Sequence, residues 1–116
     1  MSDVNKNIPP AYLTLASVLC EGKESSKTSK EIIKALGWNS NDSRRVFHIV
    51  EELITKYGYL IGSSRKGEYR GYYIISNYDE YLETIGTYNS QIQSMLNRHR
   101  KLQESYMKKD QLQANL

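Results

Sequence analysis

The chain has 116 residues, of which 39% are hydrophobic and 25% charged, and a formal net charge of +3. This balance is typical of one globular domain with an extension. No apolar run approaches the ~18 residues that a transmembrane helix needs, and the polar start lacks the features of a signal peptide, so we expect no membrane association. The single cysteine, Cys20, cannot form an internal disulfide, which favours a cytoplasmic protein.

Residues 1–8 are polar, and we expect them to be flexible. Pro9 and Pro10 predict the start of a helix, because proline fits a first turn in which no intrahelical N–H bond is lost. Apolar residues then recur at helical spacing as far as Leu19, and Gly22 predicts the end of this segment. Cys20 ends the apolar stretch, where we expect it to be a small buried side chain.

A second, short helix is predicted from Thr28 to Gly37, after a polar loop. Thr28 and Glu31 have the spacing of a capping box, and Gly37 suits a left-handed helix end. The start of this helix, with Ser29, is a candidate phosphate contact, although helix capping explains these hydroxyls equally well.

A third helix is predicted over residues 41–58, with Asn41 or Asp42 as its cap. One broad arc is apolar and predicts the face that packs on the core: Val46, Ile49, Val50, Leu53, Ile54 and Tyr57. The opposite face is polar and contains Arg44, His48, Glu51 and Thr55, with Arg45 and Glu52 at its edge. Trp38, in the preceding turn, is predicted to plug the core.

A β-hairpin is predicted over residues 59–76, because two apolar arms flank the basic, glycine-containing tip SSRKGEYRG. Three helices followed by a basic hairpin, here over residues 9–76, resemble a winged helix-turn-helix DNA-binding domain. The resemblance implies that the third helix enters the major groove and that the hairpin is a wing against the DNA backbone. It implies these DNA-binding residues: Ser29, Arg44, Arg45, His48, Thr55, Ser63, Ser64, Arg65, Lys66 and Arg70. A hairpin that uses basic residues only to prevent edge pairing is the alternative.

A long C-terminal helix is predicted over residues 77–107, opened by Asn77 and Glu80 in the form of a capping box, with Gly86 as a kink or break. Apolar residues recur along it at alternating spacings of three and four, which indicates a heptad seam: Ile85, Tyr88, Ile92, Met95, His99, Leu102 and Tyr106. Such a stripe must pack on another copy, on a partner or back along the domain, and parallel or antiparallel self-association as a homodimer is the preferred prediction. Residues 108–116 are predicted to be a frayed tail.

The sequence contains no recognisable catalytic, metal-binding or phosphate-binding motif. His48, His99 and Cys20 are isolated, no glycine-rich phosphate loop is present, and the adjacent Glu51 and Glu52 diverge on a helix. We therefore predict no catalysis, no metal and no cofactor.

The predicted fold is mainly α with a small β-hairpin, in the α+β class. The predicted function is binding of double-stranded DNA by a homodimer, in transcription or replication control of the kind found in bacteria and phages. The rival prediction is a winged helix that binds a protein, as an adaptor or as an inhibitor of a host replication or transcription protein. It is motivated by the tyrosine-rich hairpin and by Glu51 and Glu52, since acids beside phosphates weaken DNA binding.

Overall fold

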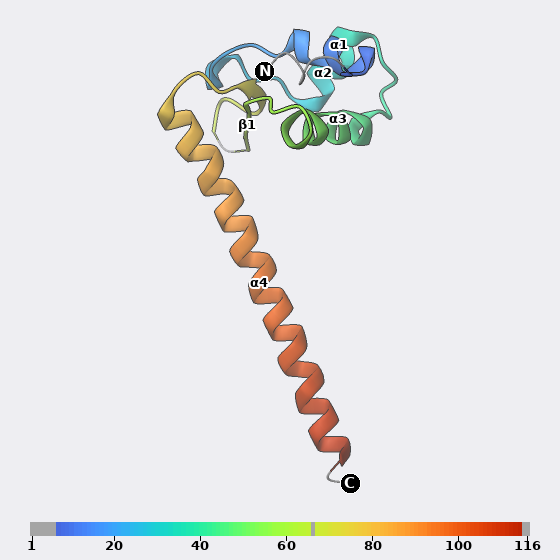
Figure 1. Cartoon of the computed structure of the whole chain (residues 1–116), viewed down its shortest axis with the longest axis vertical. Coiled ribbons are helices and arrows are strands. Elements are labelled where there is room, and N and C mark those ends of the chain that lie inside the picture. Colours follow the sequence, from blue (N-terminus) through green and yellow to red (C-terminus); the bar gives the residue numbers. More distant parts are fainter. Residues whose placement is uncertain (1–6, 66, 115–116) are drawn as a thin grey trace. The chain divides into compact units, whose positions relative to one another are not determined.

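The computed structural model describes residues 7–65 and 67–114 and is mainly helical, with one small hairpin (Figure 1). The predicted α+β class is confirmed. The elements in chain order are α1 (Pro10–Val18), the short 3-10 helix η2 (Lys23–Ser25), α2 (Ser29–Leu36), α3 (Ser43–Thr55), β1 (Ile61–Ser64), β2 (Gly71–Ile74) and α4 (Tyr78–Ala114). The chain divides into two units, unit 1 from Met1 to Thr84 and unit 2 from Ile85 to Leu116.

The starts and ends of the first two helices follow the predicted local signals. Pro9 and Pro10 open α1. Thr28 caps α2 with a complete capping box, in which its hydroxyl accepts from the Glu31 N–H and the Glu31 carboxylate accepts from the Thr28 N–H. The Thr28 hydroxyl also donates to the Glu31 carboxylate at 3.1 Å, and the hydrogen bonds from the Thr28 N–H and hydroxyl hold the pKa of Glu31 below its usual value. Gly37 ends α2 with a left-handed backbone, φ 68°.

The core of unit 1 lies among the first three helices. Its buried side chains include Leu15 of α1 and Ile32 of α2, together with Val46 and Leu53 from the apolar arc of α3. Ile8 is also buried, although the sequence predicted residues 1–8 to be polar and flexible. An apolar residue at the end of a mostly polar segment gives no clear signal of burial, so only the tertiary contacts reveal the role of Ile8.

The hairpin is antiparallel and buries side chains on both faces. Ile61 pairs with Ile74, and both pack on the helical core, whereas Gly62 pairs with Tyr73 on the opposite face. Tyr73 is completely buried, and a Cβ at Gly62 would lie 2.7 Å from its ring and 2.9 Å from the Thr84 hydroxyl of α4. The first turns of α4 therefore cover the second face. Because both faces of the hairpin are covered, the second strand has a continuous run of apolar residues rather than an alternation with polar ones.

The free edge of β2 is covered by the connection between α1 and α2, which the sequence predicted to be a simple polar loop. Ile74 N–H donates to the Cys20 carbonyl at 2.8 Å, and Tyr72 exchanges two backbone hydrogen bonds with Lys27. Gly71 has φ 116°, and a Cβ there would overlap the Lys27 carbonyl, so glycine is needed for this approach. The predicted burial of Cys20 is wrong: this edge pairing fixes its backbone and leaves its side chain exposed, 3.3 Å from Lys27 Nζ.

The start of α4 is fixed to unit 1 by Glu80, a buried carboxylate. Asn77 caps the helix through its Oδ1, which accepts from the Glu80 N–H at 2.9 Å. The Glu80 side chain does not complete the predicted capping box; it accepts from the N–H of Ser76 and from the N–H of Lys23, both at 2.8 Å. These hydrogen bonds lower the pKa of Glu80. One carboxylate thus joins the hairpin exit, α4 and the loop after α1.

The rest of α4 is regular to Ala114. The helix continues through Gly86 without the predicted break, and it extends beyond residue 107, where the sequence predicted a frayed tail. Residues 101–114 contain neither glycine nor proline and are rich in lysine, glutamine, leucine and methionine, which favour helix. Although α4 is 37 residues long, neither it nor another described helix is long and apolar enough to cross a membrane.

Candidate nucleic-acid interface

The outer face of α3 presents a mixed set of exposed side chains. Because the apolar arc is turned into the core, Arg44, His48 and Glu51 face solvent at helical spacing. Thr55, the last residue of α3, is also exposed, but its hydroxyl donates to the Glu51 carbonyl at 2.9 Å. Phe47 lies among these residues with 55% of its surface exposed. Phe47 was not among the residues predicted for either face; its signal was an aromatic residue outside the predicted apolar arc.

Arg45 is held in place at the start of α3. Its guanidinium carbon lies 3.9 Å from the centre of the Trp38 ring, and its Nη1 lies 3.8 Å from the Asp42 carboxylate. Asp42 occupies the cap position, but its side chain accepts from the Asn39 N–H rather than from the helix. Trp38 packs against the core, as predicted, and its ring also supports Arg45. A stacked guanidinium is oriented before it meets a ligand, so Arg45 is suited to hold a phosphate.

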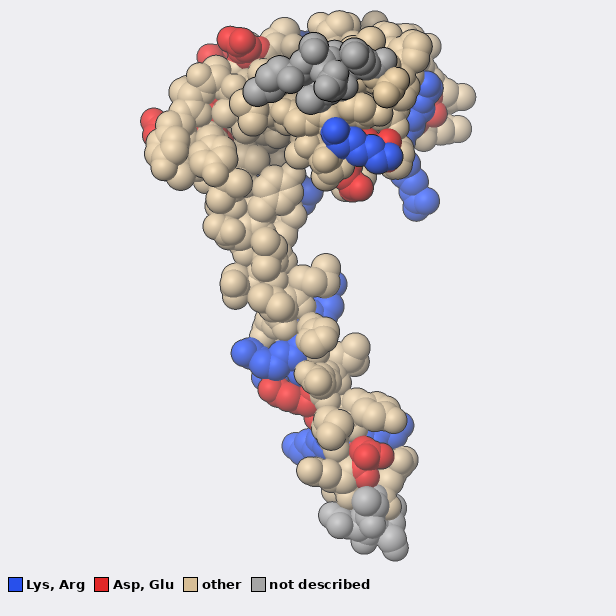
Figure 2. All heavy atoms as spheres, viewed as in Figure 1, with Lys and Arg blue, Asp and Glu red and all other residues tan. Residues whose placement is uncertain are grey.

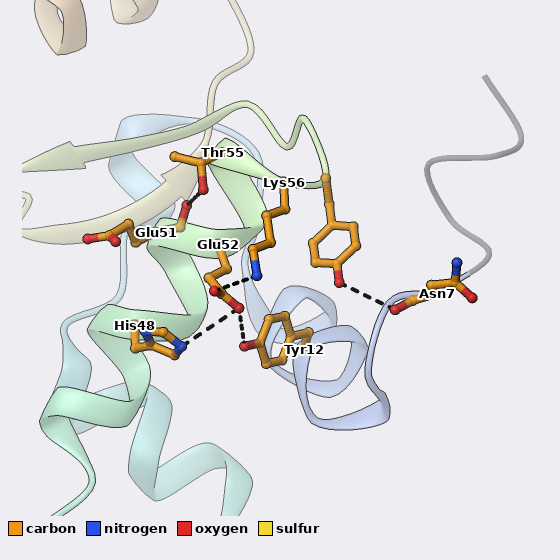
Figure 3. Close-up of polar contacts among 8 residues, drawn as sticks. Asn7, Tyr12, His48, Glu51, Glu52, Thr55 and Lys56 are labelled. Atoms are coloured by element: carbon orange, nitrogen blue, oxygen red, sulfur yellow. Dashed lines mark hydrogen bonds and ion pairs between the residues drawn. The ribbon is translucent and has the colours of Figure 1, made fainter.

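Glu52 is tied to α1 by a cluster of polar contacts (Figure 3). Tyr12 of α1 donates its hydroxyl to Glu52 Oε1 at 2.6 Å, and Lys56 Nζ lies 2.9 Å from Oε2. His48 Nε2 lies 3.7 Å from the same carboxylate. The hydrogen bond from Tyr12 is the largest cause of the lowered pKa of Glu52, followed by the one from Lys56, and in return it raises the pKa of Tyr12.

This cluster changes how strongly Glu51 and Glu52, the acidic pair of α3, would oppose a nearby phosphate. Figure 3 shows Glu51 and Glu52 pointing in different directions from the helix, with Glu52 turned toward Tyr12. The charge of Glu52 is offset by Lys56 next to it. Glu51 is therefore the acid of this pair that stands exposed on the outer face.

The hairpin tip is exposed and basic within its described residues. Arg65 and Arg70 are both exposed, and Arg70 Nε donates to the Gly67 carbonyl at 3.4 Å. Lys66, predicted to be a wing residue, lies outside the described residues. Ser63 and Ser64 belong to β1 rather than to the tip, and Ser64 is only 8% exposed, which disfavours the predicted phosphate contact by Ser64. Because Ser63 and Ser64 are paired within the hairpin, they lie closer to the body of the domain than the sequence suggested.

Ser29 is the first residue of α2 and is partly buried. Its neighbour Thr28 supplies the helix cap, so capping does not account for Ser29. Figure 2 shows that basic side chains project from the part of unit 1 that contains α3, with acidic ones among them. The charge on this face is thus mixed, as the sequence of α3 predicts.

The predicted seam of α4 is exposed along its whole length. Its seven members, Ile85, Tyr88, Ile92, Met95, His99, Leu102 and Tyr106, all face solvent. The heptad spacing also includes Tyr78 and Tyr81, which were not among the predicted seam residues and whose ring centres are 5.9 Å apart. Leu82 and Leu96 widen the stripe on one side and are exposed as well. A solvent-exposed row of this length is typical of a helix that packs on a partner.

Among the described residues, no group of three or more His, Cys, Asp or Glu side chains could hold a metal ion. Comparison with models of protein families, with curated proteins and with solved structures found no match to this chain.

Proposed function

We propose that unit 1 is a winged helix that binds double-stranded DNA and that the chain acts as a homodimer through α4. The observation that carries the proposal is that one compact unit exposes arginines on two elements, the outer face of α3 and the hairpin tip. The engagement of Glu52 with Tyr12 and Lys56 supports it, because that contact removes one of two acids from the face that would meet phosphates. The proposed setting is cytoplasmic control of transcription or replication, of the bacterial or phage type.

In this proposal α3 lies in the major groove. Arg44 and His48 contact base edges or phosphates, since both are exposed near the N-terminal end of the helix. Arg45, already stacked on Trp38, holds a phosphate. Arg65 and Arg70 of the hairpin tip bind the backbone alongside, which positions the domain without reading sequence.

The test is the salt dependence of binding to a mixed-sequence duplex, followed by fluorescence anisotropy. The double variant Arg65→Ala/Arg70→Ala should weaken binding to all sequences. It should also reduce the slope of log K against log salt by about 1.8 per domain bound, since each lost phosphate contact contributes roughly 0.9.

A matched control separates contact from overall charge. Lys101→Ala/Lys108→Ala also removes two exposed positive charges, but from α4 rather than from the tip. This variant should keep the slope of the unaltered chain. If the two double variants behave alike, or if the tip variant leaves the slope unchanged, the wing role is wrong.

A protein-binding winged helix is the second candidate, and the exposure of Phe47 favours it. A half-exposed phenylalanine at the edge of the outer face of α3, beside Glu51, suits a protein surface with apolar and mixed-charge groups. The same side chain also suits contact with a thymine methyl group in DNA. Absence of DNA binding at ~50 mM salt, where a phosphate footprint is strong, together with recovery of one stoichiometric protein partner that Phe47→Ala loses, would favour this candidate.

A further inference from the structure

The seam of unit 2 has a spacing that is unchanged when the chain direction is reversed. From Ile85 to Leu102 its six members are separated by three, four, three, four and three residues. All six are exposed on one helix, and no described contact covers them. In a pair of helices that run in opposite directions, each position of one copy therefore meets a seam position of the other.

Charge is distributed unevenly along the same helix. Residues 85–97 carry no charged side chain, whereas residues 98–110 carry five basic and two acidic ones, a net charge of +3. In Figure 2 the coloured side chains of unit 2 accordingly gather toward the C-terminal half of α4. Two copies in the same direction would place these basic segments side by side. Opposite directions, centred between Ile92 and Met95, place each basic segment beside residues 77–89 of the other copy, which contain no lysine or arginine, and this avoids the repulsion.

The polar member of the seam supports the same orientation. Two parallel copies in register would bring the two His99 rings together, and would stack the two Tyr88 rings in another layer. In the opposite orientation His99 meets Tyr88 of the partner subunit. An imidazole nitrogen and a phenol hydroxyl form a hydrogen bond, so the polar groups of the interface satisfy each other.

We propose that α4 binds a second copy of this chain in an antiparallel pair centred between Ile92 and Met95. In this register Ile85 meets Leu102 of the partner subunit, Tyr88 meets the partner's His99, and Ile92 meets the partner's Met95. The inference rests on the proposed self-association and does not depend on DNA binding.

The test uses the full chain without DNA, in a Cys20→Ser background so that the exposed native thiol does not interfere. Sedimentation equilibrium first establishes the mass in solution. Ile85→Cys and Leu102→Cys are then made separately and oxidised alone and as an equimolar mixture that has been allowed to exchange subunits. Gln93→Cys, on the outer side of the same helix, measures linking by random collision, and circular dichroism confirms that each variant keeps its helix.

The expected result is a dimer in which the mixture gives a disulfide between Ile85→Cys and Leu102→Cys chains, identified by mass spectrometry. Its yield should exceed that of the Gln93→Cys control on the order of 10-fold, because paired thiols have a high effective concentration. Efficient linking of either variant to itself would overturn the proposal in favour of a parallel pair. A monomer, or a dimer in which neither pairing links, would also overturn it. Each of these failures leaves the DNA-binding proposal of unit 1 standing.

Discussion

Replacement of Glu80 by glutamine should destabilise unit 1, because this one side chain joins three segments. Its Oε1 accepts from the N–H and the hydroxyl of Ser76, at 2.8 and 2.9 Å, and its Oε2 accepts from the Lys23 N–H at 2.8 Å. Glutamine retains one acceptor oxygen and places an NH₂ group against an N–H donor. At least one hydrogen bond to a charged group is lost, for which about 2 kcal/mol is expected.

This change should be visible as a fall in the midpoint of thermal unfolding of roughly 10 °C, given the size of unit 1. The fluorescence of Trp38, the only tryptophan of the chain, reports on this unit, since Trp38 packs against its core. Glu83→Gln is the matched control: its carboxylate also contacts Lys23, but through the exposed Nζ, at 2.7 Å. The control should change stability little, because exposed ion pairs contribute little.

The effect should depend on pH in a defined direction. The hydrogen bonds from Ser76 and Lys23 hold the pKa of Glu80 below its ordinary value of 4.5 in the folded chain. The stabilisation by the carboxylate is therefore fully present above about pH 4.5 and is lost as the pH falls through the lower folded pKa. The difference between the unaltered chain and Glu80→Gln should shrink on acidification. A difference that is equal to that of Glu83→Gln, or that grows as the pH falls, would refute this reasoning.

Three further substitutions test other parts of the structure. Gly71→Ala should destabilise unit 1 by at least ~2 kcal/mol in urea unfolding, because φ is 116° and the new Cβ would overlap the Lys27 carbonyl; a neutral result would contradict this backbone approach. Gly86→Ala should stabilise α4 by about 1 kcal/mol, seen in the thermal loss of helical circular dichroism, since nothing lies near the added methyl group. Phe47→Ala should change the free energy of unfolding by less than about 0.5 kcal/mol, because the ring is half exposed, but it should weaken binding of the DNA or protein target. A larger loss of stability would show instead that the ring serves the fold.

Local sequence signals predicted the elements of this fold well. The two prolines before α1, the capping box at Thr28, the left-handed Gly37 and the apolar arc of α3 each act within one or two helical turns. Such signals are readable because the atoms that satisfy them are near in the chain. The same holds for the hairpin and for the seam of α4, whose positions follow from spacing alone.

The candidate site was predicted only in outline. The sequence placed Arg44 and His48 on the outer face of α3, where the structure also has them. It treated Glu51 and Glu52 as a pair, although Glu52 is held by Tyr12, forty residues away in the chain. It also placed Ser64 at the hairpin tip. The strand register that buries Ser64 depends on how the hairpin packs against the rest of unit 1, which local signals do not predict.

By itself, the sequence determined which segments are helices and strands and which stripe of α4 is apolar, because these depend on neighbouring residues. Only the tertiary structure decided the role of Glu80, the burial of Ile8 and the close approach that requires Gly71. Each of these depends on groups from distant segments that meet after folding. A carboxylate that accepts hydrogen bonds from two loops looks, in one dimension, like any acid in the first turn of a helix.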